Sequence, residues 1–154
     1  MNERFKTLSA VMLMLTRKNS EGKEEILLQK RMNTGYMDGY WDFSASGHVE
    51  NHESMKMATV REAKEELGIN IKIEDLEFIT LIHKNTTPIY YNGYFKANRW
   101  EKEPKVNEPD KCEEIKWFII DNLPENIIDD RNIAIQNYKN NIPYSELGWN
   151  KNGG

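Results

Sequence analysis

Glutamates gather in one stretch of the sequence at spacings that suit a helix. The segment GHVENHESMKMATVREAKEELGI, residues 47–69, holds five of them. Glu62, Glu65 and Glu66 have offsets of zero, three and four, so in a helix their carboxylates project from one stripe. Like charges at these spacings repel and raise one another's pKa values, and a divalent cation removes that conflict. The stretch therefore predicts a metal site.

The type of ligand indicates the type of ion. Carboxylates are hard oxygen donors, which suit Mg²⁺ or Mn²⁺. His48 and His52 are four residues apart, but HVENH differs from the zinc pattern H-E-x-x-H and precedes the expected helix. The alternative interpretation of the glutamates is a solvated helix face on which they pair with basic side chains one turn away.

Hydrophobic patterning indicates the elements that must position these side chains. We expect strands over residues 5–16, 24–31, 41–46, 71–83, 89–97 and 114–120, and helices over residues 54–67 and 129–140. The predicted fold is α/β, with one mixed sheet flanked by two helices in a single domain over residues 1–154 and a frayed tail from about residue 145.

The first helix is expected to pack by one face. Met57, Val60, Ala63 and Leu67 fall on that face, and the glutamate stripe is expected on the opposite face. Gly68 suits a left-handed residue at the end of the helix.

Charge and cysteine content narrow the class of protein. A formal net charge of −4 argues against extended nucleic-acid binding. Cys112 is the single cysteine, which excludes an internal disulfide and fits a reducing cytoplasm. The apolar run LSAVMLML is far shorter than the roughly 20 residues that span a bilayer and lacks an A-x-A-like cleavage site, so we interpret it as a buried strand.

The glutamates belong to a longer pattern. Gly47 is followed by Glu53 after five residues, by Arg61-Glu62 after seven more, and then by Glu65-Glu66, Gly68 and Ile69. This order resembles the complete Nudix box, G-x5-E-x7-R-E-U-x-E-E-x-G-U, in which U is a bulky aliphatic residue; Ala63 is the one soft match. The chain is thus similar to the Nudix hydrolases, and in particular to their MutT-like bacterial members.

This resemblance implies a fold, an activity and roles for the box residues. It implies an α/β/α sandwich that uses Mg²⁺ or Mn²⁺ to hydrolyse a nucleoside diphosphate linked to another moiety. Glu62 and Glu66 match metal ligands, and Glu65 matches either a ligand or a residue that activates water. Arg61 would orient Glu53 or a neighbouring glutamate through a charge-assisted pair. The backbone carbonyl of Ser46 matches a further ligand position.

A distal loop is expected to supply another carboxylate. WEKEPKVNEPDK contains Glu103 and Glu108, and Glu108 matches best the loop glutamate that binds metal or acts as the base in nucleotide-sanitising relatives. Its alternative is a solvated side chain. Whether the base is a box glutamate or Glu108 stays open.

Residues outside the box bear on the substrate. Arg31 could meet a phosphate or lie in solvent, and Tyr36 could stack on a base or belong to the core. Asp129 and Asp130 resemble residues that read a base edge in purine-triphosphate members, and Asp at a helix start is also ordinary capping.

Nucleoside triphosphates, including oxidised purines, are the expected substrates. ADP-ribose, dinucleoside polyphosphates, capped RNA ends and prenyl or thiamine diphosphates are alternatives. YWDFSASGHVE also resembles isopentenyl-diphosphate-isomerase-like Nudix proteins, but those use a cysteine before the box where this chain has Ser44 and Ser46. A binding module without catalysis would show a broken box, and this box is complete. Dimers are common in the family, so a homodimer is a further expectation.

Overall fold

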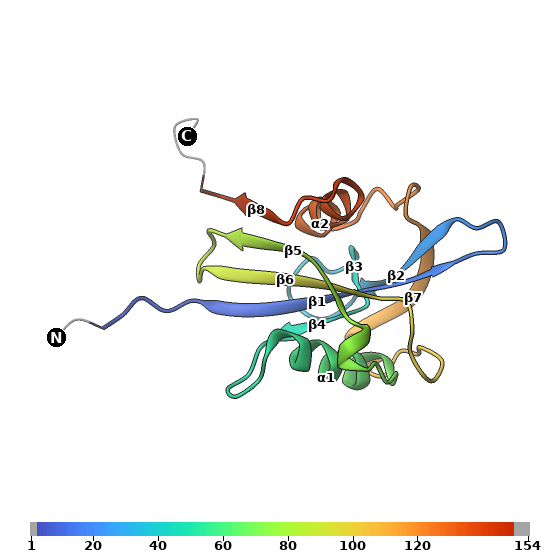
Figure 1. The fold of residues 1–154 in the computed structure, drawn as a ribbon, viewed down its shortest axis with the longest axis horizontal. Helices are drawn as coiled ribbons and strands as arrows, with labels where there is room; N and C mark the ends of the chain where they lie inside the picture. The colour runs from blue at the N-terminus through green and yellow to red at the C-terminus, as the bar shows by residue number, and fades with distance from the viewer. Residues whose placement is uncertain (1–2, 150–154) are drawn as a thin grey trace.

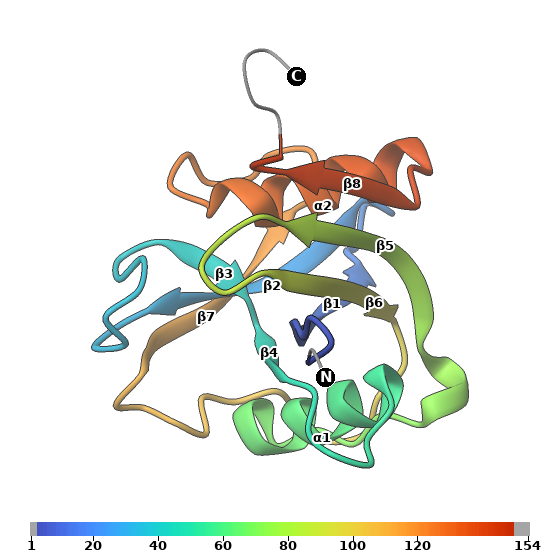
Figure 2. The same cartoon turned by 90° about the vertical axis from the view of Figure 1, so that its left-hand side faces the viewer.

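The computed structural model describes residues 3–149, which form a mixed sheet between two helices. Figure 1 shows the order of the elements, and Figure 2 shows α1 covering one face of the sheet and α2 the other. The strands are β1 (Leu8–Lys18), β2 (Glu24–Arg31), β3 (Trp41–Phe43), β4 (Ala45–His48), β5 (Glu77–Lys84), β6 (Tyr90–Ala97), β7 (Cys112–Ile119) and β8 (Tyr144–Leu147). The helices are α1 (Met55–Leu67), the short 3₁₀ helix η1 (Ile73–Asp75) and α2 (Asp129–Asn140).

The central strand β1 builds a core on both faces of the sheet. Val11, Leu13 and Leu15 pack on the α1 side, whereas Met12 and Met14 pack on the α2 side. Alternate residues of a strand point to opposite faces, so a strand covered on both sides is apolar throughout. The run LSAVMLML is therefore a buried strand, as expected.

The sheet divides beside β1, and this division positions the candidate site. One edge of β1 pairs with β4 over its first half and with β2 at its end. β2 in turn pairs with β3 on one edge and with β7 on the other. The segment 41–46, predicted as one strand, is therefore two strands: β3 belongs to β2, and β4 belongs to β1. Ser44 lies at the crossing between them.

Helix α1 has the expected ends but a different buried face. Ser54 Oγ accepts a hydrogen bond from the Met57 amide at its start, and Gly68 ends it with φ of 70°. Met57, however, is 46% exposed. The buried positions are Ala58, Thr59, Ala63 and Leu67. The expectation that Met57 packs inward is thus wrong, because the helix rests on small side chains that bring it close to β4.

Two further expectations need correction. Residues 73–75 form η1, with Ile73 44% exposed, so the predicted strand over 71–83 begins only at Glu77. The described part of the predicted tail, up to Trp149, is ordered and not frayed. β8 pairs in parallel with β5, and the Trp149 indole donates a hydrogen bond to the His83 carbonyl (3.0 Å). The rest of the predicted tail, residues 150–154, lies outside the described residues. Helix α2 has the predicted bounds.

Candidate active site

Gly47 allows the Glu62 side chain to lie directly against the backbone of β4. A Cβ at position 47 would collide with the Glu62 carboxylate. Glycine is the residue that permits such a close approach of side chain and backbone. Glu62 therefore points into the space between α1 and β4, and its side chain is 14% exposed.

Glu66 points into the same space, one turn further along α1. The amide of Ser46 donates to its carboxylate (2.8 Å). Burial, the hydrogen bond to Glu62 and the charges of Glu62 and Glu108 together raise the pKa of Glu66 to about 9, although the Ser46 amide acts in the opposite direction. The expectation that the stripe lies opposite the packed face is thus wrong for these two glutamates. They lie between helix and sheet because Ala58, Ala63 and Gly47 leave room there, and only Glu65 points into solvent (54% exposed).

Arg61 forms hydrogen bonds with four residues of the box. Its guanidinium donates to both oxygens of Glu53 (2.6 and 3.0 Å), to Glu62 (2.6 Å), to Glu65 (3.3 Å) and to the His48 carbonyl (3.1 Å). The ion pair expected between Arg61 and Glu53 is therefore formed. The hydrogen bond from Arg61, with a second from the Glu50 amide, lowers the pKa of Glu53 to about 2. Glu53 thus stays ionised and fixes the arginine.

The distal loop brings Glu108 to the glutamates of α1. The amides of Lys105 and Asn107 donate to the carbonyls of Leu67 and Glu66 (3.0 and 3.1 Å). The last carbonyls of a helix have no partner within it, so they are natural anchors for a loop. Glu108 follows this anchor directly and lines the same cavity as the box glutamates.

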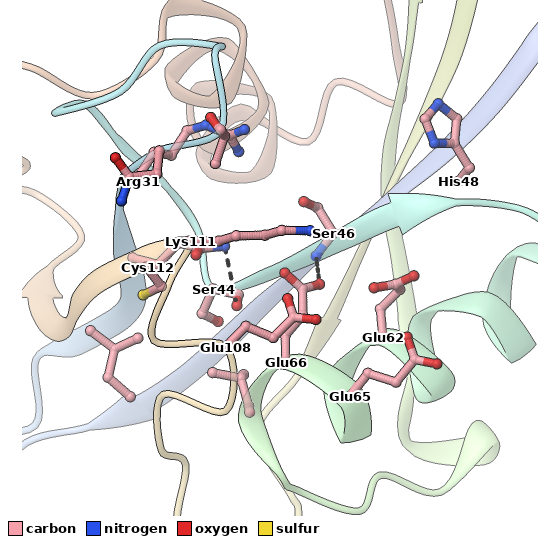
Figure 3. Close-up of a pocket in the computed structure, with 15 residues that line it drawn as sticks. Arg31, Ser44, Ser46, His48, Glu62, Glu65, Glu66, Glu108, Lys111 and Cys112 are labelled. Carbon is pink, nitrogen blue, oxygen red and sulfur yellow. Dashed lines mark hydrogen bonds between the residues drawn. The ribbon is translucent and has the colours of Figure 1, made fainter.

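A cavity of about 550 Å³ lies where these elements meet (Figure 3). Glu62, Glu65, Glu66 and Glu108 line one part of its wall, and Arg31 and Lys111 line another. Figure 3 shows the Lys111 side chain extending across the cavity towards Ser46. The cavity thus combines carboxylates that suit a metal with cations that suit phosphate oxygens.

The cavity also contains residues that the sequence did not single out for it. Lys111, Gln29 and His48 line it, and so does Cys112, although Cys112 is far from the box in the sequence. Lys111 carried one usable signal, since it comes three residues after Glu108 in the distal loop. The others depend on how β2, β4 and β7 converge, which no local pattern encodes.

The donor set fits a hard divalent cation. Within residues 3–149, no group of three His, Cys, Asp or Glu side chains converges closely enough to enclose an ion. The reason is visible in the contacts, because Arg61 draws Glu62 and Glu65 towards itself. The buried carboxyl group of Glu66 nevertheless lies beside the carboxylates of Glu62 and Glu108, whose charges raise its pKa. Glu62, Glu65, Glu66 and Glu108 are the side chains that could hold a metal, and all are oxygen donors.

The Ser46 carbonyl faces the same region. Ser46 is opposite Met12 in the β1–β4 ladder, and its amide points away from β1 to Glu66. Within a strand the N–H and C=O of one residue point to the same side. The carbonyl is therefore directed towards the carboxylates, where it could serve as a fifth oxygen donor.

Two of the expected substrate residues lie beside the cavity. Arg31 donates to the buried carboxylate of Asp42 (2.9 Å) and to the Tyr36 carbonyl (2.6 Å), and its guanidinium lies 5.2 Å from the centre of the Tyr36 ring. Arg31 also lines a second cavity of about 450 Å³, and Tyr36 lines that cavity too. Arg31 is therefore at the junction of the two cavities, and Tyr36 belongs to the second one.

The two aspartates of α2 are placed differently. Asp129 is exposed at the start of the helix. Asp130 is buried and pairs with Lys84 (2.6 Å) and Arg131 (3.3 Å). Neither aspartate is among the residues that line these two cavities. Asp130 instead fixes two cations, one of which, Arg131, reaches the buried Asp42 (2.6 Å).

Fold and site together define an α/β protein with an acidic, metal-compatible cavity beside a loop–helix–loop element. Comparison with known proteins identifies the family, because the model of the NUDIX domain matches residues 6–138. The chain belongs to the Nudix family and is a Nudix hydrolase. Nudix hydrolases generally use divalent metal ions.

Solved structures agree with this assignment. A MutT NUDIX hydrolase from Burkholderia pseudomallei is 25% identical, with a TM-score of 0.75 over 86% of this chain and 98% of that one. A MutT/nudix family protein from Enterococcus faecalis is 19% identical, with a TM-score of 0.72 over 91% of this chain and 64% of that one. The NUDIX domain of Shewanella oneidensis NrtR, crystallised with ADP ribose, is 15% identical, with a TM-score of 0.70 over 90% of each chain. The expected Nudix sandwich is thus confirmed. Among the helices of residues 3–149, none has the length and apolar character to cross a membrane.

Proposed function

We propose that this chain, acting as a single Nudix domain, hydrolyses the diphosphate linkage of a nucleoside diphosphate linked to a further group, with Mg²⁺ or Mn²⁺. The observation that carries the proposal is the buried Glu66 carboxyl group in a cavity that it shares with Glu62, Glu65 and Glu108. Arg61 pairs with Glu62 and Glu65, but ionising the buried Glu66 beside these carboxylates is costly unless a further cation joins them.

The metal would be held by Glu62, Glu65, Glu66, Glu108 and the carbonyl of Ser46. When bound, Mg²⁺ or Mn²⁺ neutralises diphosphate oxygens and makes its bound water more acidic. Arg61 holds Glu62 and Glu65 in place, and the ionised Glu53 fixes Arg61 in turn. Either Glu65 or Glu108 accepts the proton of the attacking water.

Arg31 and Lys111 would bind the phosphate oxygens of the substrate. Both line the cavity away from the box helix, and the Lys111 side chain extends over it (Figure 3). Cations there balance charge that develops on the leaving phosphate.

Nucleoside triphosphates, including oxidised purines, are the proposed first-choice substrates. The single cysteine fits a reducing cytoplasm, where such substrates occur. ADP-ribose, which the NrtR domain binds in its crystal, and dinucleoside polyphosphates are the alternatives for this chain.

A phosphate-release screen over these compounds with Mg²⁺ tests the proposal. Nucleoside monophosphate and pyrophosphate as products would support triphosphate chemistry, and two phosphomonoesters would support a sugar-linked or dinucleotide substrate. Absence of turnover on every compound, together with absence of Mg²⁺ binding, would contradict the proposal.

Substitutions in the distal loop test which glutamate accepts the proton of the attacking water. Glu108→Gln should lower kcat by at least about 10-fold if Glu108 is the base, and it should remove the acidic limb of the pH–rate profile. Glu103→Gln is the matched control, since Glu103 is exposed in the same loop and does not line the cavity. Retention of the acidic limb in Glu108→Gln would assign the base to Glu65.

Cys112 allows the isomerase alternative to be tested as well. It lines the cavity, and burial raises the pKa of its thiol, so it is protonated at neutral pH. The proposed hydrolysis does not use this thiol. Cys112→Ser should therefore retain hydrolysis within about 3-fold of wild type. If the wild type instead converts isopentenyl diphosphate and Cys112→Ser does not, the result would favour an isomerase.

A further inference from the structure

The distal loop donates hydrogen bonds to the last three carbonyls of α1. The Leu67 carbonyl accepts from the Lys105 amide (3.0 Å), and the Glu66 carbonyl accepts from the Asn107 amide (3.1 Å). The Glu65 carbonyl accepts from the Asn107 side chain through Nδ2 (3.2 Å). The last carbonyls of a helix have no partner within it. The loop therefore completes the end of the helix that carries the box glutamates.

Asn107 has the chemistry that this contact needs. It offers a backbone amide and a side-chain amide as two donors on one residue, and its Nδ2 also lies 3.4 Å from the Lys64 carbonyl. The carboxyl end of a helix carries partial negative charge, so donors are favourable there and a carboxylate is not. Aspartate has the same shape as asparagine but would lose the side-chain contact and be repelled.

Glu108 depends on this contact for its place in the cavity. It follows Asn107 directly and is exposed, so packing does not hold its side chain beside Glu66 (Figure 3). Its carbonyl accepts from the amides of Lys111 and Cys112 (3.0 and 3.2 Å), which closes a turn at the start of β7. Glu108 is therefore held between β7 on one side and, through Asn107, the end of α1 on the other.

Helix α1 is held without help from the loop. Ala63 and Leu67 are buried in the core beneath it, and Arg61 donates to Glu62 from the helix itself. Loss of the Asn107 side-chain contact should thus displace the loop and leave the helix in place.

The other end of the turn has an attachment of its own. The Met32 amide donates to the Lys111 carbonyl (3.0 Å), and Asn33 Nδ2 donates to the Asp110 carbonyl (3.3 Å). These contacts fix Lys111, which we propose to bind phosphate, to the end of β2. A substitution of Asn107 should therefore disturb the carboxylate end of the turn more than the phosphate-binding end.

We infer that Asn107 is a positioning residue, which holds Glu108 beside the glutamates of α1 in the geometry that metal binding and turnover require. The inference rests on the proposed hydrolysis, in which Glu108 is a metal ligand and one of two candidate bases. Asn107 does not line the cavity, so it acts through Glu108 and touches neither metal nor substrate.

Two substitutions of Asn107 remove the side-chain donor. With Mg²⁺ and the best substrate of the screen, kcat should fall by at least about 5-fold in Asn107→Ala. It should fall further in Asn107→Asp, which also places a negative charge at the end of the helix. KM at saturating Mg²⁺ should stay within about 3-fold of wild type, because the Lys111 end is attached separately. Asn98→Asp adds the same charge at an exposed position beyond β6 and should resemble wild type.

Titration calorimetry with Mn²⁺ alone gives a readout that does not depend on turnover. Asn107→Ala should raise the Kd for Mn²⁺ by at least about 3-fold, because Glu108 is then less well placed as a ligand. In a Glu108→Gln background the same substitution should change neither kcat nor this Kd by more than about 2-fold, since the carboxylate that it positions is gone.

The outcomes separate the inference from the proposed function. Equal losses from Asn107→Ala in the wild-type and Glu108→Gln backgrounds would overturn the inference, because they would show that Asn107 supports the fold and not Glu108. It would also be overturned by both Asn107 variants having kcat and Mn²⁺ affinity within about 2-fold of wild type, or by wild-type turnover in Glu108→Gln. All these results leave the proposed hydrolysis intact. Absence of metal-dependent turnover in the wild type would contradict the proposed function and this inference with it.

Discussion

Replacing Glu66 with glutamine should stabilise the metal-free protein while it removes metal-dependent turnover. Burial and the neighbouring carboxylates raise the pKa of Glu66 to about 9, compared with an ordinary value of 4.5. Between these two values the folded state retains a proton that the unfolded chain has released. Glutamine has nearly the same shape as the protonated side chain and has no proton to lose.

The size of the effect follows from the difference in pKa. For a folded pKa raised above the unfolded value, stability is fully present below pH 4.5 and falls as the pH rises towards 9. At pH 7, which is 7 − 4.5 = 2.5 units above the ordinary value, the cost is about 3 kcal/mol at roughly 1.36 kcal/mol per unit. For a chain of this size, Glu66→Gln should raise Tm by roughly 6 to 12 °C in the absence of metal.

Thermal unfolding in EDTA at pH 5 and pH 7 measures this difference. The gain in Tm should nearly vanish at pH 5, and Mg²⁺ should raise the Tm of the wild type but not that of Glu66→Gln. Glu103→Gln, at an exposed position of the distal loop, should change Tm little at either pH. A Glu66→Gln protein that is less stable than wild type at pH 7 without metal would refute the reasoning.

Two other substitutions test how the site is held. Gly47→Ala places a methyl group against the Glu62 carboxylate, so kcat with Mg²⁺ should fall by at least about 10-fold with an unchanged circular dichroism spectrum; wild-type kinetics would show that Glu62 need not lie there. Asp42→Asn weakens the pairing of the buried cations Arg31 and Arg131 and should cost about 3 kcal/mol in urea unfolding. The exposed Asp129→Asn should stay within about 0.5 kcal/mol of wild type, and equal losses in the two variants would contradict the buried network.

Local sequence rules predicted the elements that have strong local signals. Helix α2 has the predicted bounds, and α1 lies within the predicted residues 54–67 and ends at the expected Gly68, because periodicity and the left-handed cap act over a few neighbouring positions. The division of residues 41–46 into β3 and β4 depends on two different partner strands, so it could not be read from those six residues. β8 likewise exists because β5 offers a free edge to it.

The candidate site was predictable in its residue types but not in its orientation. The box spacing brought Glu62, Glu65 and Glu66 together on one helix, yet helical geometry alone did not show which face meets the sheet. Gly47 decided this, because a residue without a Cβ makes room for Glu62 beside β4. The contribution of Lys111 and the burial of Asp130 in an ion-pair network arise from long-range contacts, which the sequence does not state locally.

Steady-state turnover of Glu66→Gln with Mg²⁺ tests the central claim most directly. The assay uses the best substrate of the phosphate-release screen, with wild type and Glu103→Gln measured beside it. We predict that kcat of Glu66→Gln falls by at least about 100-fold while its fold is retained and its Tm without metal is no lower than that of wild type. Glu103→Gln should resemble wild type. A kcat of Glu66→Gln within a few-fold of wild type would contradict the assignment of this cavity as the active site.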